Sequence, residues 1–436
     1  MLQTPPQILR RSLSAMTFVA IALMTLLPLH GEVKSVTPIK PSASLPTTMP
    51  WKLDELSKAP IFEWSADRPS AGGQIVRSLF YAGELYQGKK TKVFAYYGTP
   101  GTLTRDPSKD KNLPAVVLVH GGGGKADAGW AQLWAKRGYA AIAIDLTGSG
   151  PDKKPHADCG PEMGDDIKFG AIDGPITDQW PYHAVADMIL AHSLIRSFPE
   201  VDQEKTAITG YSWGGFLSCL GAALDDRFKA AVPVFGCGFI DQNSAWLDRF
   251  KNMSPQSRAK WVTLWDPSTY MASATVPMLF VNGGTDKYFR PDSYAKTYDL
   301  VKAPKNIHFV PELRHGALID KPKAVELFME HHLRGGVILP QVATPVLSDT
   351  QVKAGVETKT KLLKAELHYS LDVILGVAET RKWITNPATL EQTNIVAELP
   401  PKVATIWFLT VTDERDALVS SPLMFSNTKP NPEAGK

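Results

Sequence analysis

The stretch Ile208-Thr-Gly-Tyr-Ser-Trp-Gly-Gly-Phe216 decides the fold that we predict for this chain. A strand-like run, 206–209, leads into it, and the residues that follow it are compatible with a helix. Gly210 and Gly214 stand two residues before and after Ser212, which leaves room for a sharp, strained turn. We therefore predict a strand, a tight turn and a helix, with the serine hydroxyl above the helix N-terminus, where developing negative charge is favoured. The alternative is a serine that only shapes a turn.

A second informative stretch lies upstream. Ala115-Val-Val-Leu-Val119 is short, apolar and rich in β-branched residues, a pattern typical of a strand that is buried on both faces of a parallel sheet. It leads directly into His120-Gly-Gly-Gly-Gly124. Glycine allows the backbone to approach a ligand closely. A phosphate-binding loop is the alternative, but it requires Ser or Thr after its lysine, and here Lys125 is followed by Ala126.

A serine hydroxyl is a weak nucleophile at its own pKa, so a base must lie beside it and an acid must orient that base. Asp286 follows the strand-like run 276–282, and His315 follows the strand-like run 306–310. Both residues therefore come just after a strand, at the sheet edge where open α/β sheets bind their ligands. We predict that His315 is the base and Asp286 the acid.

The other candidates for these two roles have less favourable positions. His308 lies within a predicted strand, His331 and His332 fall in a helix over 324–333, and His368 lies beyond the catalytic region. Asp292 is the nearest rival acid, but its position fits a helix N-cap. The adjacent histidines at 331 and 332 also lack the spacing that places two metal ligands on one helix face, so we predict no metal.

In this order, the motifs resemble those of the α/β-hydrolase superfamily over roughly residues 75–335. The segments 198–202 and 210–216 resemble the branch of dienelactone hydrolases, acetyl xylan esterases and prolyl oligopeptidases. The resemblance implies a chain order of nucleophile, acid and base, here Ser212, Asp286 and His315. It also implies an oxyanion hole formed by two backbone N–H groups, those of Gly122 and Trp213, with Gly121 and Gly123 as alternatives for the first donor.

The resemblance implies a serine hydrolase that needs no cofactor and cleaves a carboxylic ester through an acyl-enzyme on Ser212. A small-molecule or polysaccharide ester is the expected substrate, with deacetylation of a carbohydrate such as xylan as the specific hypothesis. A prolyl oligopeptidase-like peptidase is the alternative. Such peptidases usually carry a large β-propeller before the hydrolase domain, whereas only about 40–80 residues separate the targeting segment from the first strands here, which favours an esterase. A third hypothesis is a binding protein that has lost activity on the same scaffold.

Composition restricts the other classes of function. The chain has 436 residues, of which 44% are hydrophobic and 21% charged, as is ordinary for a globular protein with a proper core. The formal net charge is only +3, and no basic stretch has aromatic residues interleaved. Nucleic acid is therefore not an expected partner. The oligomeric state does not follow from the sequence.

The N-terminal residues have the pattern of a signal peptide, which we place at 1–31. Arg10 and Arg11 form a basic region, and the apolar run 16–29 suits a signal sequence and is short for a membrane span. We expect a secreted or periplasmic protein with no stable membrane span after processing; an uncleaved anchor is the alternative. Export permits disulfides, but three pairings of Cys159, Cys219 and Cys237 are open.

The predicted fold class is α/β, with the α/β-hydrolase fold: a mainly parallel, doubly wound sheet that is antiparallel at its N-terminal edge, followed by a small β-rich domain. Within it, a helix over 182–197 is predicted to place Val185, Met188, Ile189 and His192 on one apolar face. The predicted segments are an irregular lead-in at 32–72, the catalytic domain at 73–336 with an aromatic-rich cap at 238–272, a linker at 337–356 and the β-rich domain at 357–428.

Overall fold

The computed structural model describes residues 1, 33–65, 75–316, 322–373 and 379–426. Apart from Met1, the predicted signal peptide at 1–31 lies outside these residues. Within the described part of the chain, no helix has both the length and the apolar character needed to span a bilayer.

A single twisted sheet forms the centre of the hydrolase domain. Its strands, in order across the sheet, are β1 (Phe62–Trp64), β2 (Arg77–Ala82), β3 (Lys92–Gly98), β5 (Ala140–Ile144), β4 (Leu113–Val119), β6 (Val201–Tyr211), β7 (Ala230–Val234), β8 (Met278–Gly283) and β9 (Lys305–Val310). The six strands from β5 to β9 are mutually parallel, whereas β1, β2 and β3 pair in antiparallel fashion. The predicted α/β fold with an antiparallel N-terminal edge is confirmed.

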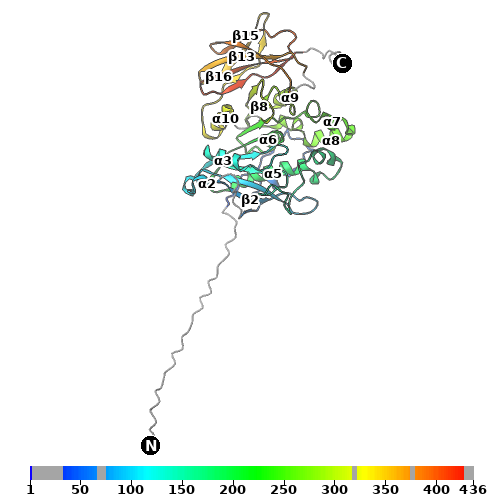
Figure 1. The fold of residues 1–436 in the computed structure, drawn as a ribbon, viewed down its shortest axis with the longest axis vertical. Helices are drawn as coiled ribbons and strands as arrows, with labels where there is room; N and C mark the ends of the chain where they lie inside the picture. Colours follow the sequence, from blue (N-terminus) through cyan, green and yellow to red (C-terminus); the bar gives the residue numbers. More distant parts are fainter. Residues whose placement is uncertain (2–32, 66–74, 317–321, 374–378, 427–436) are drawn as a thin grey trace.

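Helices cover both faces of this sheet (Figure 1). Side chains of β4 alternate between two hydrophobic cores: Val117 and Val119 pack into one, and Val116 and Leu118 into the other. Such a strand has no solvent-facing side, which explains its unbroken apolar sequence. The helices are α1 (Leu53–Leu56), α2 (Pro100–Thr104), α3 (Ala128–Lys136), α4 (Asp165–Gly170), α5 (Trp180–Ser197), α6 (Trp213–Leu224), α7 (Leu247–Lys251), α8 (Pro255–Trp265), α9 (Pro291–Leu300) and α10 (Lys323–Arg334).

The helix α5 differs from its sequence-based prediction, because it is buried on all sides and not only along one face. The described part of the lead-in covers its outer side. The Trp51 indole N–H donates to the Tyr182 carbonyl oxygen at 2.9 Å, and the Ser193 hydroxyl donates to the Leu56 carbonyl oxygen at 2.7 Å. The lead-in is thus largely irregular, as predicted, but it forms part of the core.

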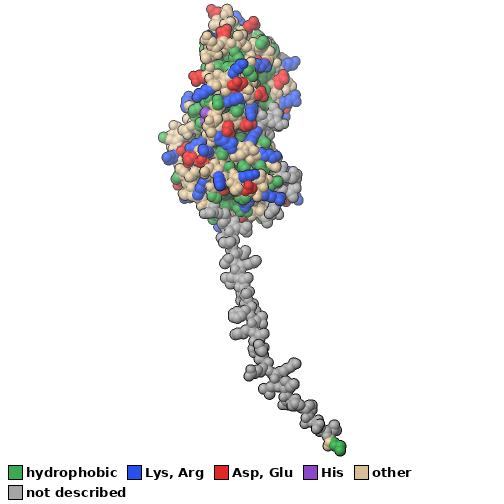
Figure 2. Space-filling view, turned by 90° about the vertical axis from the view of Figure 1, so that its left-hand side faces the viewer, with side chains coloured by type: hydrophobic (Ala, Val, Ile, Leu, Met, Phe, Trp, Pro, Cys, Tyr) green, Lys and Arg blue, Asp and Glu red, His purple; other side chains and the backbone are tan. Residues whose placement is uncertain are grey.

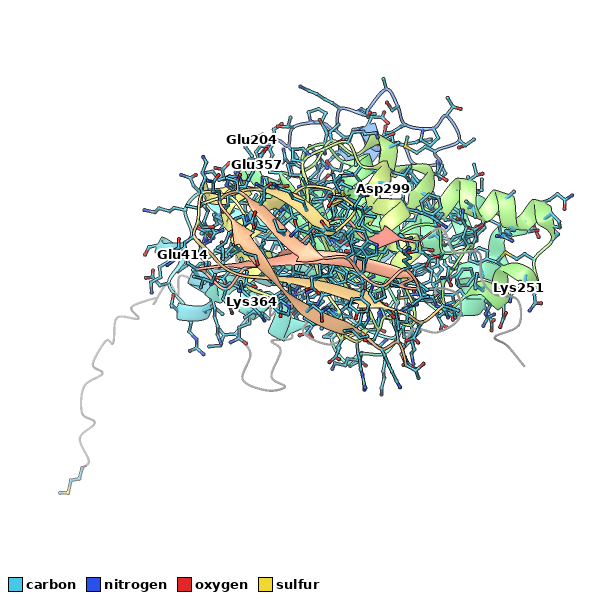
Figure 3. All side chains as sticks on the ribbon, turned by 90° about the horizontal axis from the view of Figure 1, so that it is seen from above. Glu204, Lys251, Asp299, Glu357, Lys364 and Glu414 are labelled. Atoms are coloured by element: carbon cyan, nitrogen blue, oxygen red, sulfur yellow. The ribbon has the colours of Figure 1, made fainter. Side chains whose placement is uncertain are left out.

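The cap at 238–272 is helical and carries α7 and α8. Its large aromatic side chains are buried, including those of Trp246, Phe250, Trp261, Trp265 and Tyr270. In Figure 3, α7 and α8 extend to one side of the C-terminal strands, with Lys251 marking the end of α7. These aromatic side chains belong to the same hydrophobic core as one face of the central sheet, so the cap packs on the hydrolase domain.

The C-terminal strands form a separate core that is joined to the central sheet (Figure 1). These strands are β10 (Gln341–Val342), β11 (Val346–Leu347), β12 (Gln351–Glu357), β13 (Leu362–Ser370), β14 (Ile384–Glu391), β15 (Asn394–Glu398), β16 (Ile406–Asp413), β17 (Leu418–Ser420) and β18 (Met424–Phe425). Strand β17 pairs with β9 in antiparallel fashion, with Ser420 opposite Ile307. The C-terminal domain thereby continues the hydrolase sheet.

The segment 337–356, predicted as a linker, contains β10, β11 and most of β12. Alternate residues of β12, namely Val352, Ala354 and Val356, are buried in the C-terminal core, and the strand pairs with β15. The two prolines at 340 and 345 break the chain only before this alternation begins. The β-rich unit therefore begins earlier than position 357.

Candidate active site

Ser212 lies in the turn between β6 and α6, in a backbone conformation that L-residues rarely adopt. Its φ is 58° and its ψ is −122°. The turn is held from both sides, because the Ser212 N–H donates to the Val234 carbonyl oxygen at 2.8 Å and the Phe216 N–H donates to the Ser212 carbonyl oxygen at 2.9 Å. A strained residue held in this way is typical of a functional position.

The glycines around the serine are required by close backbone contacts. A Cβ on Gly210 would overlap the Gly214 carbonyl oxygen, and a Cβ on Gly214 would overlap the Val119 carbonyl oxygen. A Cβ on Gly215 would likewise overlap the backbone of β7. The start of α6 therefore lies directly against the ends of β4 and β7, and this contact sets the sharpness of the turn.

The structure brings together the three side chains predicted as nucleophile, base and acid. His315 Nε2 lies 2.9 Å from Ser212 Oγ, and His315 Nδ1 lies 2.9 Å from Asp286 Oδ2. Asp286 is fully buried, and its Oδ1 accepts the N–H groups of Tyr288 at 2.7 Å and Phe289 at 3.1 Å. An ionised Asp286 requires a proton on Nδ1, which leaves Nε2 free to accept the serine proton.

The other histidines near the C-terminus have partners of their own. His308 Nδ1 bonds the Leu418 carbonyl oxygen at 2.8 Å, and His368 lies between the hydroxyls of Thr385 and Thr410. His331 Nδ1 bonds the Gly336 carbonyl oxygen at 2.6 Å, and the imidazole of His332 packs on Phe328. Asp292 lies in the first turn of α9, two residues past the N-cap residue Arg290, and accepts the Asn243 side-chain amide at 2.7 Å.

The glycine loop after β4 lies against the serine, and His120 fixes its shape. A Cβ on Gly121 would be 2.8 Å from the Ser212 Cβ. His120 Nε2 accepts the Leu146 N–H at 2.9 Å, so its protonated Nδ1 donates to the Gly121 carbonyl oxygen at 2.8 Å. Burial lowers the pKa of His120, which keeps it neutral in this role.

This arrangement also orients the N–H of Gly122. In a trans peptide the N–H points opposite to the preceding carbonyl. The Gly121 carbonyl is held by His120 and by the Gly124 N–H at 3.0 Å, so the Gly122 N–H points away from the body of the loop. Gly122 is solvent-exposed, and Trp213 occupies the first position of α6. The assignment of the Gly122 and Trp213 amides as oxyanion donors stays a prediction.

Aromatic side chains surround the three residues. The His315 ring centroid lies 4.6 Å from that of Tyr288 and 5.2 Å from that of Phe235. From the cap, Trp246 packs on Trp213 with a centroid distance of 4.9 Å and on Tyr288 at 5.8 Å. One aromatic side chain of the cap therefore lies at the site, while Phe250 and Trp261 pack against each other at 5.0 Å in the interior of the cap.

The sequence analysis missed the short helix α4, whose residues also lie beside the serine. Lys168 Nζ is 2.7 Å from Asp165 Oδ1 and lies over the Trp213 ring, 4.4 Å from its centroid. Phe169 packs on Trp213 at 5.8 Å. The spacing i, i+3, i+4 of these three α4 residues, Asp165, Lys168 and Phe169, marks one helix face and is the signal that was available.

No metal centre emerges from the described residues, among which no group of three or more His, Cys, Asp or Glu side chains is placed to hold an ion. All three cysteines are free thiols: Cys219 and Cys237 are buried and Cys159 is half-buried. Within the described part of the chain, none of them forms a hydrogen bond or ion pair with the triad.

Comparison with known proteins agrees with this geometry. Residues 86–241 match the acetyl xylan esterase (AXE1) family, and residues 248–372 match the PhoPQ-activated pathogenicity-related protein family. Acetyl esterase Axe7A from Xylanibacter ruminicola is 24% identical over 239 residues, which are 52% of this chain and 54% of the relative. The chain thus spans about half the length of this relative.

Two solved structures share the fold. The acetyl xylan esterase from Paenibacillus sp. R4 is 21% identical with a TM-score of 0.52, and the comparison covers 64% of this chain and 92% of that one. Acetyl Xylan Esterase 1 from Thermoanaerobacterium sp. JW/SL YS485 is 19% identical with a TM-score of 0.51, covering 67% and 95% of the two chains. These two structures show that the chain has the α/β-hydrolase fold, and residues 86–241 are similar to the acetyl xylan esterase (AXE1) family.

Proposed function

We propose that this protein is a serine hydrolase that cleaves carboxylic esters through an acyl-enzyme on Ser212. The observation that carries the proposal is the hydrogen-bonded series from Ser212 through His315 to Asp286, with both distances at 2.9 Å. Its nucleophile has the strained φ of 58° that lifts a hydroxyl clear of the sheet.

The geometry supports a two-step reaction. His315 Nε2 takes the Ser212 proton as the serine oxygen bonds to the ester carbonyl carbon, whose oxygen becomes an oxyanion. The tetrahedral intermediate collapses, the bond to the alkoxy oxygen breaks, and the imidazolium returns the proton to the leaving alcohol. Water then attacks the acyl-serine with His315 again as the base, which releases the carboxylic acid and restores the serine hydroxyl. Asp286 fixes the imidazole tautomer and stabilises its charged form.

For the substrate, we propose an acetyl ester of a carbohydrate. The match of residues 86–241 to the acetyl xylan esterase family supports this choice, as does the similarity to the acetyl esterase Axe7A. The aromatic side chains of Trp246 and Tyr288 beside the serine offer apolar faces of the kind that line small-molecule sites.

We also propose that the protein is exported, because the apolar run at 16–29 suits a signal sequence. Mass analysis of the mature N-terminus of the protein from a secreting host tests this proposal.

The proposal is tested by a substrate screen with the Ser212→Ala variant as its reference. We expect wild-type protein to release acetate from acetylated xylan and short-chain aryl esters, and the variant to lose roughly 10³-fold or more in kcat. Proline-containing peptides form the second arm of the screen. Release of dipeptides without release of acetate would favour the peptidase alternative, and full activity of Ser212→Ala would remove this serine from the mechanism.

A further inference from the structure

A buried ammonium group lies in the wall of the active site. Lys168 is on α4, and only 3% of its side chain is exposed. Lysine is almost never buried to this extent unless it is paired, because removing its charge from water is costly. Burial accordingly lowers its pKa, and the contact with Asp165 opposes this shift only in part. A lysine whose burial costs this much free energy is a candidate for a functional role.

The contacts of Lys168 place its charge beside the turn between β6 and α6 that carries Ser212, which we call the elbow. Its Nζ lies 2.7 Å from Asp165 Oδ1, 4.4 Å from the centroid of the Trp213 ring and 5.8 Å from that of Trp180. Asp165 satisfies one side of the ammonium, and aromatic faces cover the others. Trp213 directly follows the nucleophile, so the charge lies beside the first turn of α6.

The same ammonium group is close to the glycine loop. A Cβ placed on Gly122 would lie 3.9 Å from Lys168 Nζ and 2.9 Å from the Trp213 Cδ1. Lys168 therefore approaches both residues whose backbone N–H groups are the predicted oxyanion donors. Positive charge at this point is placed to stabilise negative charge that develops between them.

The carboxylate of Asp165 does not cancel this effect, because its environment differs. Its side chain is 41% exposed, and its Oδ2 accepts the Trp246 indole N–H at 3.2 Å. Water screens a half-exposed carboxylate much more than a buried ammonium. The cap residue Trp246 thus fixes the position of the half-exposed carboxylate, while the buried ammonium lies over the Trp213 ring.

We propose that Lys168 is an electrostatic component of the oxyanion site, acting through space on the charge held by the Gly122 and Trp213 amides. This inference rests on the proposed ester hydrolysis and deepens it. The proposal does not require Lys168 to touch the reacting atoms. Its charge acts on the tetrahedral intermediate, whose carbonyl oxygen is anionic, and has little effect on the neutral ester in the ground state.

The test compares Lys168→Met with Lys260→Met. Lys260 is the matched control, because it is a half-buried lysine of α8 whose ammonium donates to the Ile172 carbonyl oxygen at 2.6 Å. For Lys168→Met we expect kcat on an acetyl ester to fall about 10- to 100-fold with KM close to wild type. Inhibition by phenylboronic acid, which forms a tetrahedral anion on the serine, is expected to weaken by a similar factor. Lys260→Met is expected to match wild type in all three quantities.

A purely structural role for Lys168 predicts a different pattern. It would change KM and thermal stability but leave the ratio of boronate affinity to ester affinity unchanged, and this result would overturn the proposal. If Lys168→Met does not fold, Lys168→Arg and Lys168→Gln provide the comparison, since only the arginine retains charge; equal kcat values for these two variants would also refute the proposal. An inactive wild-type protein would instead refute the proposed function, so the two failures are distinguishable.

Discussion

At the scale of single residues, the interior contains a second histidine–aspartate pair that differs from the triad in its access to solvent. His192 Nδ1 lies 2.8 Å from Asp225 Oδ2, and its Nε2 lies 2.8 Å from Thr206 Oγ1, with both the histidine and the aspartate fully buried. Arg227 completes the group, since its guanidinium bonds both oxygens of Asp225 and the carbonyl oxygens of Thr37 and Ser57. This buried network ties the lead-in to the core.

The buried pair leads to a prediction about acid stability. Burial lowers the pKa of His192 to about 3. Burial alone would raise the pKa of Asp225, but contacts with His192 and Arg227 lower it instead. Both groups therefore bind protons more readily in the unfolded chain, so stability is complete above about pH 6.5 and falls on acidification, by up to roughly 1.4 kcal/mol per pH unit for His192.

Urea unfolding between pH 7 and 4.5 checks this prediction. The free energy of unfolding of His192→Asn is expected to depend less steeply on pH than that of wild type. Other buried histidines titrate in both proteins, so their contributions cancel in the comparison. Parallel pH profiles for the two proteins would show that the histidine does not carry the effect.

At the scale of elements, a helix or strand was predicted well when its own residues show which of its faces are buried. It was predicted less well when residues far away in sequence cover one of its faces. Strand β4 and helix α10 carry their burial pattern in their own residues, and both were predicted to within two residues at each end. Helix α5 was predicted as one-sided because the cover for its outer face comes from the distant Trp51 and Leu56. The hydrophobic periodicity of a helix does not reveal that a segment more than 100 residues away in sequence packs against it.

The turn between β6 and α6 leads to a prediction about stability. Gly214→Ala is expected to destabilise the protein by about 3 kcal/mol or more, or to prevent folding, because its Cβ would overlap the Val119 carbonyl oxygen at the end of β4. Gly170→Ala, at the end of α4, is the matched control, since a Cβ there meets no atom within 4 Å. Soluble yield and the urea midpoint measure the difference. Equal stability of the two variants would mean that the elbow is less tightly packed than the structure shows.

At the scale of the whole molecule, the C-terminal domain contacts the loop that carries the acid. Trp383 lies against Gly284, where a Cβ would overlap its indole, and it packs on Phe309 of β9 with a centroid distance of 6.1 Å. Lys287 pairs with Glu379 at 2.8 Å across the same boundary. Trp383 therefore lies between the two domains.

This contact predicts that the C-terminal domain supports catalysis. Trp383→Ala is expected to cost about 2–4 kcal/mol of stability and to lower kcat, because the loop from Gly284 to Asp286 loses its backing. Lys382→Ala, an exposed neighbour, is the control. Hydrogen exchange of the acid loop should increase only in the tryptophan variant. If Trp383→Ala leaves both the hydrogen exchange of the acid loop and kcat unchanged, the C-terminal domain does not support catalysis through this contact.

The surface carries charges of both signs. On the face shown in Figure 2, Lys and Arg side chains are interspersed with Asp and Glu side chains. The sequence has a formal net charge of +3. It did not predict Lys168, because an isolated lysine in a polar stretch is ordinarily solvated, and only the tertiary contacts of α4 with Trp213 show that it is buried.

The proposed mechanism requires a single nucleophile at the end of β6. The most direct measurement is mass spectrometry of the protein after reaction with a fluorophosphonate, followed by peptide mapping. We expect one adduct, on Ser212, which is absent in Ser212→Ala and forms far more slowly in His315→Gln. Ester turnover by a protein that takes up no label on Ser212, or equal labelling rates in wild type and His315→Gln, would contradict the mechanism.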